Sequence, residues 1–454
     1  MGSPPLDPLF QWLFSLSGPS LKWDIETARE FCAWLGHSQR AFPSVHVAGT
    51  NGKGSVAAMI HAMAGASGLR AGLLTSPHLV RPEERIRVGE DEISPRAFAE
   101  RIEALRDQAA RALDAGKLPR HPSFFEMICA AAFVEFARER VPLAVLETGL
   151  GGRLDATNVV YPVVSVITTI ALDHVKSLGG SITAIAREKA GIIKPGIPVL
   201  AGWIDPEAEA VVRAAARRQG APFHAAREEI VVTPTAGGDG FDVQTPEQRY
   251  QGLTCALAGP HQQRNAALAL RAAELARQRG VAFSTRGLSA GLARVRWPGR
   301  LESLGQAPTF LLDAAHNREG IEALAACLEE RPRPARRVLI FGLTAGRPPA
   351  EIFAPLAGRV DAVVLTRPRS PKAVATGEIA AAIAPASPAL WQRDEVGEAI
   401  ALARREAGPA GEVLVTGSLY LVGDVRRELL DLEGPWRRPA EKVPPVESAN
   451  HHVS

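Results

Sequence analysis

The chain has 454 residues, 46% of them hydrophobic and 22% charged, and its formal net charge is +3. This length predicts two or three domains whose cores need no disulfide or metal to hold them. A net charge this small does not indicate a basic surface for binding nucleic acid. We also expect no signal peptide and no membrane span, because the N-terminus lacks a basic segment and the apolar runs are short. Four widely spaced cysteines predict reduced thiols in a cytoplasmic protein.

Short apolar, β-branched runs alternate with helical patterns along the chain. We expect buried strands at 44–48, 143–146, 163–168, 198–201, 310–313, 338–341, 362–366 and 413–416. Such alternation predicts right-handed βαβ units, and therefore an α/β fold of parallel sheets covered by helices on both faces. From about Asp205 to Gly259 short alternating segments predict a small antiparallel excursion instead.

The segment RWPGR at 296–300 predicts a hinge, because proline and glycine interrupt the pattern before a new strand–helix series. We therefore expect a first domain over 1–297 and a second over 298–434. The remainder, 435–454, is polar and contains prolines, which predicts a disordered tail.

The strongest local signal is a glycine-rich loop, GTNGKGS at 49–55, between an apolar strand and a helix. Glycine lets backbone N–H groups approach phosphate oxygens, and the helix N-terminus favours anions. Lys53 can neutralise the β- and γ-phosphates, and Ser55 can bind Mg²⁺. The residues expected to bind nucleotide here are Gly49, Thr50, Asn51, Gly52, Lys53, Gly54 and Ser55. The common pattern GxxxxGK[ST] is not matched, because Gly54 separates the lysine from the serine.

With this extra glycine, the loop GTNGKGS resembles that of the folate branch of the Mur ligase superfamily, the dihydrofolate synthase/folylpolyglutamate synthase family. Further strings carry the likeness: ETGLGGRLDATN at 147–158, with Thr148 where the family has valine, EKAG at 188–191 and SFFE at 123–126. The resemblance implies a P-loop ATPase-type parallel-sheet domain followed by a smaller Rossmann-like α/β domain. It also implies an ATP-dependent ligase of folate biosynthesis and one-carbon metabolism. Such a ligase adds L-glutamate to dihydropteroate, and to the terminal glutamate of folates, through an acyl phosphate, and it releases ADP and phosphate.

Carboxylates and other ligands at strand ends point to metal binding. Glu147 ends a strand and faces the crevice where open α/β sheets bind ligands, so it could hold Mg²⁺ opposite the loop. The resemblance implies two Mg²⁺ ions and adds His174, Ser76 and a carbamylated Lys189 as ligands. It thus implies catalytic roles for Lys53, His174 and Lys189.

The resemblance also assigns contacts to the substrates. Asn265, Arg300 and Asp313 are implied to reach ATP, the latter two from the second domain. The residues implied to line the pterin and aminobenzoate site are Ser123, Phe124, Phe125, Glu126 and Leu154.

Two segments depart from the family pattern and bear on specificity for the folate or for glutamate. They are Trp23-Asp24-Ile25, where bacterial relatives often have Gly-Leu, and Gly346-Arg347-Pro348, where Lys or Asp is usual. The expected partners are small molecules only, without nucleic acid or membrane, and the expected state is a monomer.

Two other functions remain open from the sequence. One is a Mur ligase that acts on a cell-wall UDP-peptide precursor, against which Gly54 and the 147–158 string argue. The other is a P-loop ATPase switch, which should release no phosphate in response to glutamate.

Overall fold

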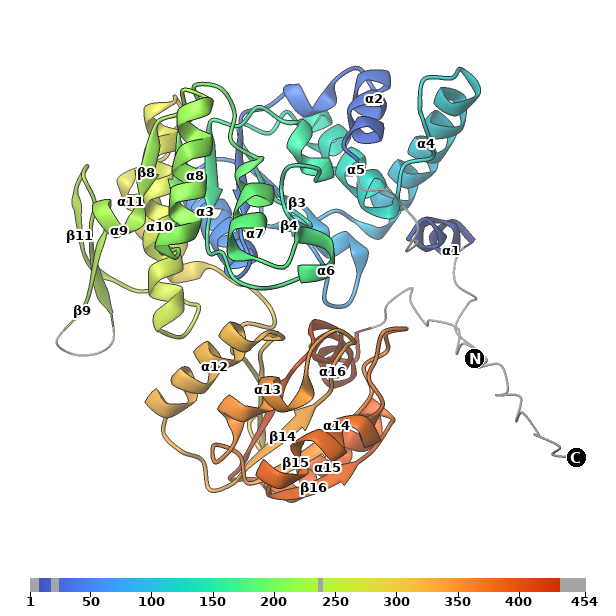
Figure 1. Cartoon of the computed structure of the whole chain (residues 1–454), viewed down its shortest axis with the longest axis vertical. Coiled ribbons are helices and arrows are strands. Elements are labelled where there is room, and N and C mark those ends of the chain that lie inside the picture. Colours follow the sequence, from blue (N-terminus) through green and yellow to red (C-terminus); the bar gives the residue numbers. More distant parts are fainter. Residues whose placement is uncertain (1–7, 18–23, 236–239, 433–454) are drawn as a thin grey trace, which may run out of the picture.

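The computed structural model describes residues 8–17, 24–235 and 240–432, and it contains two α/β parts (Figure 1). The expected tail at 435–454 lies outside the described residues. In the first part, eight described strands form one sheet in the order β4-β3-β2-β5-β1-β6-β7-β8. Six are parallel, and β3 and β4 form an antiparallel edge. The strands are β1 (Ser44–Ala48), β2 (Gly72–Leu74), β3 (Ile86–Val88), β4 (Asp91–Glu92), β5 (Ala144–Glu147), β6 (Val164–Ile167), β7 (Val199–Ala201) and β8 (Phe223–Ala225).

Helices cover both faces of this sheet. Neighbouring residues of each strand point to opposite sides, and the apolar side chains on both sides are buried under helices. In β5, Val145 packs under α3, α10 and α11, whereas Ala144 and Leu146 face α1, α2, α4 and α5. Helices α7 and α8 continue the second layer over β6 and β7. The helices are α1 (Pro8–Ser15), α2 (Glu26–Trp34), α3 (Lys53–Ala66), α4 (Pro95–Asp114), α5 (Phe124–Arg138), α6 (Val175–Leu178), α7 (Ile182–Ala190), α8 (Pro206–Arg218), α9 (Ala226–Glu229), α10 (Pro260–Gln278) and α11 (Thr285–Arg294).

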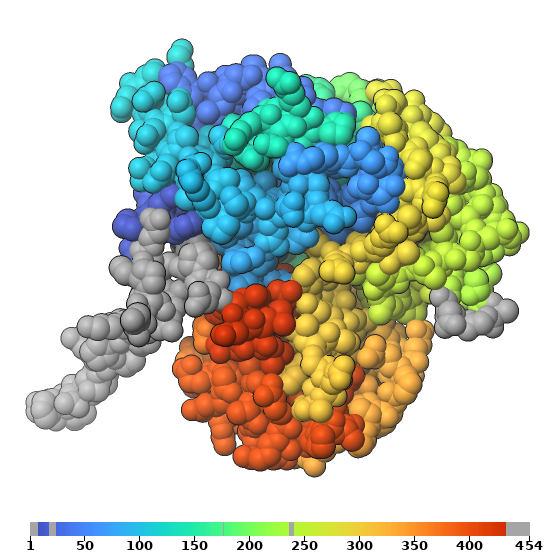
Figure 2. Space-filling model, turned by 180° about the vertical axis from the view of Figure 1, so that it is seen from behind, coloured from blue at the N-terminus to red at the C-terminus, as the bar shows by residue number. Residues whose placement is uncertain are grey.

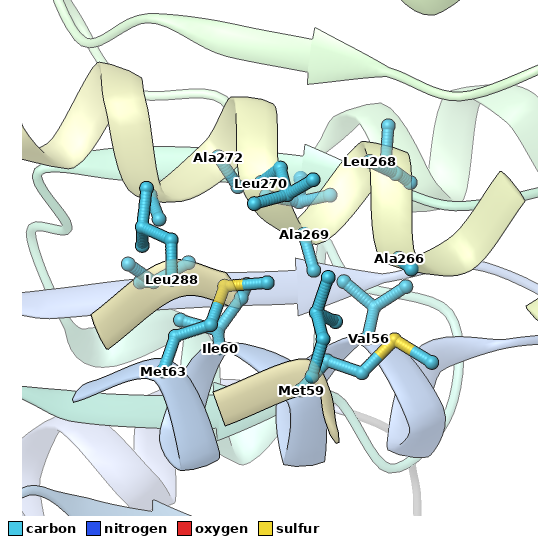
Figure 3. Close-up of a cluster of buried hydrophobic side chains, with 14 of the residues drawn as sticks. Val56, Met59, Ile60, Met63, Ala266, Leu268, Ala269, Leu270, Ala272 and Leu288 are labelled. Atoms are coloured by element: carbon cyan, nitrogen blue, oxygen red, sulfur yellow. The ribbon is translucent and has the colours of Figure 1, made fainter. Parts of the chain in front are cut away.

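The helix that follows the glycine loop is the central helix of the first core. The apolar side chains on one face of α3, Val56, Met59, Ile60 and Met63, are fully buried. Figure 3 shows these side chains pointing toward the alanines and leucines of α10 and toward Leu288 of α11. The loop is therefore fixed to a helix whose residues 54–60 are all buried.

The antiparallel excursion begins later than expected. Strands β9 (Val231–Pro234), β10 (Phe241–Gln244) and β11 (Arg249–Leu253) form a three-stranded antiparallel sheet. The prediction was wrong for residues 206–225, which form α8 and β8 of the main sheet. Helix α8 has the expected starting signals, because Asp205 caps the Glu207 N–H and Pro206 follows it directly.

The second part is a six-stranded sheet in the order β12-β13-β17-β14-β15-β16, and only β12 is antiparallel among these described strands. Its strands are β12 (Glu302–Leu304), β13 (Thr309–Leu312), β14 (Arg337–Phe341), β15 (Ala362–Leu365), β16 (Ala389–Gln392) and β17 (Glu412–Thr416). One face packs against α12 (Arg318–Glu330), α13 (Pro349–Phe353) and α14 (Thr376–Ile383), the other against α15 (Val396–Ala407) and α16 (Leu419–Leu429). Figure 2 shows this orange-to-red part as a separate lobe below the rest.

Two further expectations concern the whole chain. The cysteines Cys32, Cys129, Cys255 and Cys327 form no disulfide. None of the helices in the described ranges combines the length and apolarity needed to cross a membrane.

Candidate active site

A cavity of about 520 Å³ lies where the carboxyl ends of β1, β2, β5 and β6 face the second part of the chain. This is the edge at which parallel α/β sheets bind ligands. Its lining includes every residue expected to bind nucleotide or metal: Gly49, Thr50, Asn51, Gly52, Lys53, Gly54, Ser55, Ser76, Glu147, His174, Lys189, Asn265, Arg300 and Asp313. The fold therefore brings together groups that are spread over more than half of the sequence.

The glycines of the loop are required by close neighbours. Gly52 has a φ of 83°, and a Cβ there would lie 2.7 Å from Asn265 Oδ1. A Cβ on Gly54 would lie 3.0 Å from the indole nitrogen of Trp297. The additional glycine, Gly54, thus lets the loop pack against the hinge segment, and Gly52 lets it pack against α10.

Two threonines after β6 hold the loop in place, and neither was expected from the sequence. Thr169 accepts the Asn51 N–H through its hydroxyl at 2.9 Å, and its carbonyl accepts the Thr50 N–H at 2.7 Å. Thr168 donates its hydroxyl to the Asn51 carbonyl at 2.6 Å. The threonine pair at the strand end was the available signal, because loops that bind anions need their backbone carbonyls turned away and satisfied.

The polar side chains of the loop are held from within the protein. Lys53 Nζ donates to the Thr50 carbonyl at 3.1 Å, so the cation stays folded over its own loop. Ser55 is buried and accepts a hydrogen bond from Gln262 Nε2 at 3.3 Å. Gln262 also accepts from Asn265 Nδ2 at 3.0 Å, which makes it a further residue that the sequence analysis missed.

A buried carboxylate and a buried hydroxyl stand opposite the loop. Glu147 accepts the Ser76 N–H at 3.1 Å, and Ser76 Oγ is buried without a hydrogen-bond partner among the described residues. Burial raises the pKa of Glu147, while Lys53 and the Ser76 N–H oppose this rise. These oxygens suit Mg²⁺, which prefers oxygen ligands. Within the described ranges, no three His, Cys, Asp or Glu side chains cluster as a metal site, so any ion here also needs Ser or phosphate oxygens.

Lys189 is almost fully buried in the last turn of α7. Its Nζ donates to the Gly49 carbonyl at 2.6 Å. Burial, and then the charge of Lys53, lower the pKa of Lys189 to about 7. A lysine in this state has a substantial neutral, nucleophilic fraction at neutral pH.

His174 and Asp173 lie at the boundary between the two parts. His174 has a φ of 51° and a half-exposed side chain, and burial lowers its pKa while Asp173 opposes this. Asp173 accepts a hydrogen bond from Asn317 Nδ2 at 3.3 Å and lies 3.9 Å from Arg347 Nη2. The departure at Gly346-Arg347-Pro348 therefore places a cation beside the Asp173-His174 pair.

Residues of the second part complete the cavity. Arg300 lines it, and Asp313 accepts the Leu301 and Ala315 N–H groups at 3.0 and 2.9 Å. Asp313 thus fixes the turn that carries Arg300. Across the boundary, Asn317 Nδ2 donates to Asn51 Oδ1 at 3.0 Å, which ties the phosphate loop to the second sheet.

The five residues implied to bind the pterin do not line this cavity; they form a wall behind it. Ser123 and Glu126 form the capping box of α5, with Ser123 N–H donating to Glu126 at 2.6 Å. A Cβ on Gly149, which lines the cavity, would lie 2.7 Å from the Phe125 ring. Phe124 is buried, and Leu154 packs at the edge of the same core.

The departure near the N-terminus is connected to this wall. Arg120 donates to both carboxylate oxygens of Glu126, at 2.7 and 3.0 Å, and to Asp24 Oδ2 at 3.2 Å. Asp24 thus supports the first turn of α5 through Arg120. Trp23 lies outside the described residues.

Comparisons with known proteins agree with this arrangement. Residues 47–273 match the family model "Mur ligase middle domain", and residues 299–419 match "Mur ligase, glutamate ligase domain". The chain is 35% identical over 423 residues to the dihydrofolate synthase/folylpolyglutamate synthase of Bacillus subtilis, covering 92% of this chain and 97% of that protein. It is 40% identical over 361 residues to the protein of that name from Mycobacterium tuberculosis, covering 75% and 73%.

Solved structures show the same fold. E. coli FolC in complex with DHPP and ADP superposes with a TM-score of 0.84 at 28% identity, covering 94% of this chain and 99% of that one. The folylpolyglutamate synthase of Mycobacterium tuberculosis with ADP and AMPPCP has a TM-score of 0.84 at 33% identity, covering 93% and 98%. The chain therefore belongs to the dihydrofolate synthase/folylpolyglutamate synthase family of Mur ligases, which are ATP-dependent glutamate ligases of folate metabolism.

Proposed function

We propose that the protein adds L-glutamate both to dihydropteroate and to the terminal glutamate of reduced folates. The acceptor carboxylate attacks the γ-phosphorus of ATP, the bond to the β-phosphate breaks, and ADP leaves. The glutamate amine then attacks the acyl carbon of the resulting acyl phosphate. Phosphate leaves, the amine loses a proton, and an amide remains.

One observation supports this chemistry above the others. The glycine loop, the buried Glu147–Ser76 pair and Arg300 of the second part all line a single cavity. Phosphoryl transfer depends mainly on positioning and on charge stabilisation, and these groups can supply both. A cavity enclosed by two domains also keeps water away from an acyl phosphate.

The chain's own residues have distinct parts in this proposal. The loop N–H groups and Lys53 hold the β- and γ-phosphates, and Arg300 adds a second cation from the other domain. Asn265 supports the loop through its contact with Gln262, and Asp313 holds the turn of Arg300. Burial lowers the pKa of His174, which favours the neutral imidazole that a metal ligand needs.

We propose two magnesium sites from the ligands present. Ser55 and Glu147 would hold one ion with the phosphates, and Ser76, His174 and Lys189 would hold the second. The unpartnered Ser76 Oγ and the buried Glu147 carboxylate fit such use, because buried oxygens without partners are costly. When bound, Mg²⁺ neutralises negative charge on the phosphates.

Lys189 is proposed to carry a carbamate, which would turn a buried cation into an anionic ligand. Its neutral amine attacks carbon dioxide, an N–C bond forms, and one proton is released. The carbamate retains one N–H, which can still donate to the Gly49 carbonyl that Lys189 contacts now.

The remaining proposals concern organisation. We place the domain boundary between residues 297 and 298, just before the sheet that begins with β12. We propose a monomer that acts in the cytoplasm on small molecules alone. The groups proposed above to hold the phosphates and the metal ions all come from the described residues of this chain.

Phosphate release tests the reaction class. ATP, Mg²⁺ and L-glutamate are supplied with dihydropteroate, with tetrahydrofolate and with a cell-wall UDP-peptide, in parallel. Release should require glutamate together with one of the pteridines. Release without any acceptor would indicate a switch ATPase, and release with the UDP-peptide alone would indicate a cell-wall ligase.

A further inference from the structure

The N-terminal helix α1 covers one of the aromatic side chains in the wall behind the cavity. The rings of Phe14 and Phe124 are stacked, with centroids 5.0 Å apart and planes 17° from parallel. The Phe124 N–H also points to the Leu16 carbonyl at 3.4 Å. Figure 1 shows α1 beside α5 and α4 at the margin of the first part. The first turn of α5 is therefore joined to Phe14 by ring stacking and to Leu16 by a backbone contact.

A second group covers Phe124. The guanidinium of Arg85 lies 5.1 Å from the centroid of the Phe124 ring. Phe124 is only 9% exposed in all. A planar ligand cannot stack on this ring unless a neighbour moves, because stacked rings need direct contact.

The two neighbours differ in how firmly they are held. Arg85 is buried, and its Nε donates to His78 Nδ1 at 2.9 Å. Phe14 is half-buried and belongs to a short helix of eight residues at the margin of the fold. Phe14 is thus the neighbour that a ligand can displace.

The stacked pair adjoins the cavity. His78 lines the cavity, and its ring lies edge-on to Phe14, with centroids 6.5 Å apart. On the other side Phe125, next to Phe124 in α5, touches Gly149, which also lines the cavity. A ring entering from the cavity toward Phe124 therefore meets His78 and then Phe14.

We propose that Phe14 occupies the ring-stacking position on Phe124 in the substrate-free protein, and that the planar ring of the acceptor takes its place on binding. Phe14 is then a specificity-determining residue, since each acceptor must compete with it for Phe124. The inference rests on the proposed function, which places the acceptor ring near this wall. It concerns the ring end of the acceptor and not the phosphate chemistry.

Steady-state kinetics of Phe14→Ala with dihydropteroate test the proposal. Without the competing ring, KM for dihydropteroate should fall about three- to tenfold, the factor that corresponds to one aromatic pair. The kcat, and the KM values for ATP and glutamate, should stay unchanged. Phe14→Leu keeps an apolar side chain on α1 without a flat ring and should show a smaller fall. Gln11→Ala, at an exposed position of the same helix, is the matched control.

A KM for dihydropteroate that stays the same or rises in both Phe14 variants overturns the proposal. Phe124→Leu separates this failure from a failure of the proposed function. If Phe124→Leu raises the KM while the Phe14 variants do not lower it, the acceptor site stands and only the displacement is wrong. If Phe124→Leu leaves the KM unchanged, the acceptor ring binds elsewhere and both assignments fall.

Discussion

Lys189 donates a 2.6 Å hydrogen bond to the carbonyl of Gly49, a residue 140 positions earlier in the sequence. The bond joins the last turn of α7 to the first residue of the phosphate loop. It also keeps the Lys189 amine inside the cavity, close to Lys53, whose charge contributes to its lowered pKa. A buried lysine next to another cation is unfavourable as an ammonium ion, and conversion to an anion would relieve this.

The first prediction is a carbamate on Lys189. With ¹³C-bicarbonate, the protein should show a carbamate resonance that disappears in Lys189→Ala, and this variant should lose activity, with partial rescue by a small carboxylate. Lys194 is a matched control, because burial also lowers its pKa, to about 8, yet it donates to the Asn158 carbonyl away from the cavity. Lys194→Ala should keep the resonance. A bare ammonium on Lys189 in a Mg-ATP complex would refute the carbamate.

The second prediction concerns Lys53. Lys53→Ala should lower kcat at least about 100-fold, because one charge contact to the transferring phosphoryl group is lost. The melting temperature should change little, since the hydrogen bond of Lys53 among the described residues is to Thr50 of its own loop. Lys117→Ala, at an exposed position in the loop after α4, controls for the loss of a positive charge. Near-normal turnover in folded Lys53→Ala would contradict the loop assignment.

The sheet strands were predictable because their burial leaves a clear mark in the sequence. The runs at 44–48 and 338–341 differ from β1 and β14 by at most one residue, since fully buried parallel strands are largely apolar. The edge strands β3 and β4 were not predicted, because a strand of two or three residues that includes charged ones is too short to show an alternating hydrophobic pattern. Residues 206–225 were misjudged since the charged face of α8 concealed its four buried positions.

The third prediction concerns the stability of the fold at mildly acidic pH. Burial lowers the pKa of His46 to about 3 and that of His61 to about 4. Both lie below the unfolded value of about 6.5, so between these limits the unfolded chain binds more protons. The stability from keeping these rings neutral is fully present above about pH 6.5 and is lost as the pH falls. Below about pH 6, each of the two histidines should lower the free energy of unfolding by about 1.4 kcal/mol per pH unit.

Urea unfolding at pH 7, 6 and 5 measures this slope. His46 donates through Nε2 to Thr157 Oγ1, whose own hydroxyl donates to Asp155 at 2.5 Å, so a glutamine can replace the donor. His46→Gln should reduce the dependence of the unfolding free energy on pH by about 1.4 kcal/mol per pH unit, the contribution of one proton. His37→Gln, at an exposed position, should not change it. An equal slope in wild type and His46→Gln would contradict the assignment.

The fourth prediction concerns the contacts of Arg120. Arg120→Ala removes the cation that pairs with the buried Glu126 carboxylate, and it should lower the free energy of unfolding by about 2–3 kcal/mol. Asp24→Ala should cost less than about 1 kcal/mol, because Asp24 is more exposed than Glu126. Arg96→Ala removes an equally short but exposed ion pair with Glu100 and should leave the melting temperature unchanged. A loss in Arg120→Ala no larger than that in Arg96→Ala would refute a structural role.

The site was predictable only in part. A lysine in a glycine-rich loop suggests phosphate binding, and a carboxylate at a strand end suggests metal binding, so Lys53 and Glu147 could be proposed from the sequence. Gln262 could not, because a polar residue in a helix is usually a surface residue, and Thr169 left only a weak signal, the pair of threonines after a strand. Only the folded chain shows that they hold Ser55 and Asn51. The resemblance, not the residues, suggested Lys189, since a lysine within a helix is normally solvated.

Glutamate incorporation is the most direct test of the central claim that one apparatus serves two acceptors. Radiolabelled L-glutamate is supplied with ATP and Mg²⁺, with dihydropteroate in one reaction and a reduced folate monoglutamate in the other. Both acceptors present a carboxylate to the same γ-phosphate, so both products should form, and both should be lost together in Lys53→Ala. Incorporation with the folate alone would show a polyglutamate synthase only, and incorporation with neither would contradict the account.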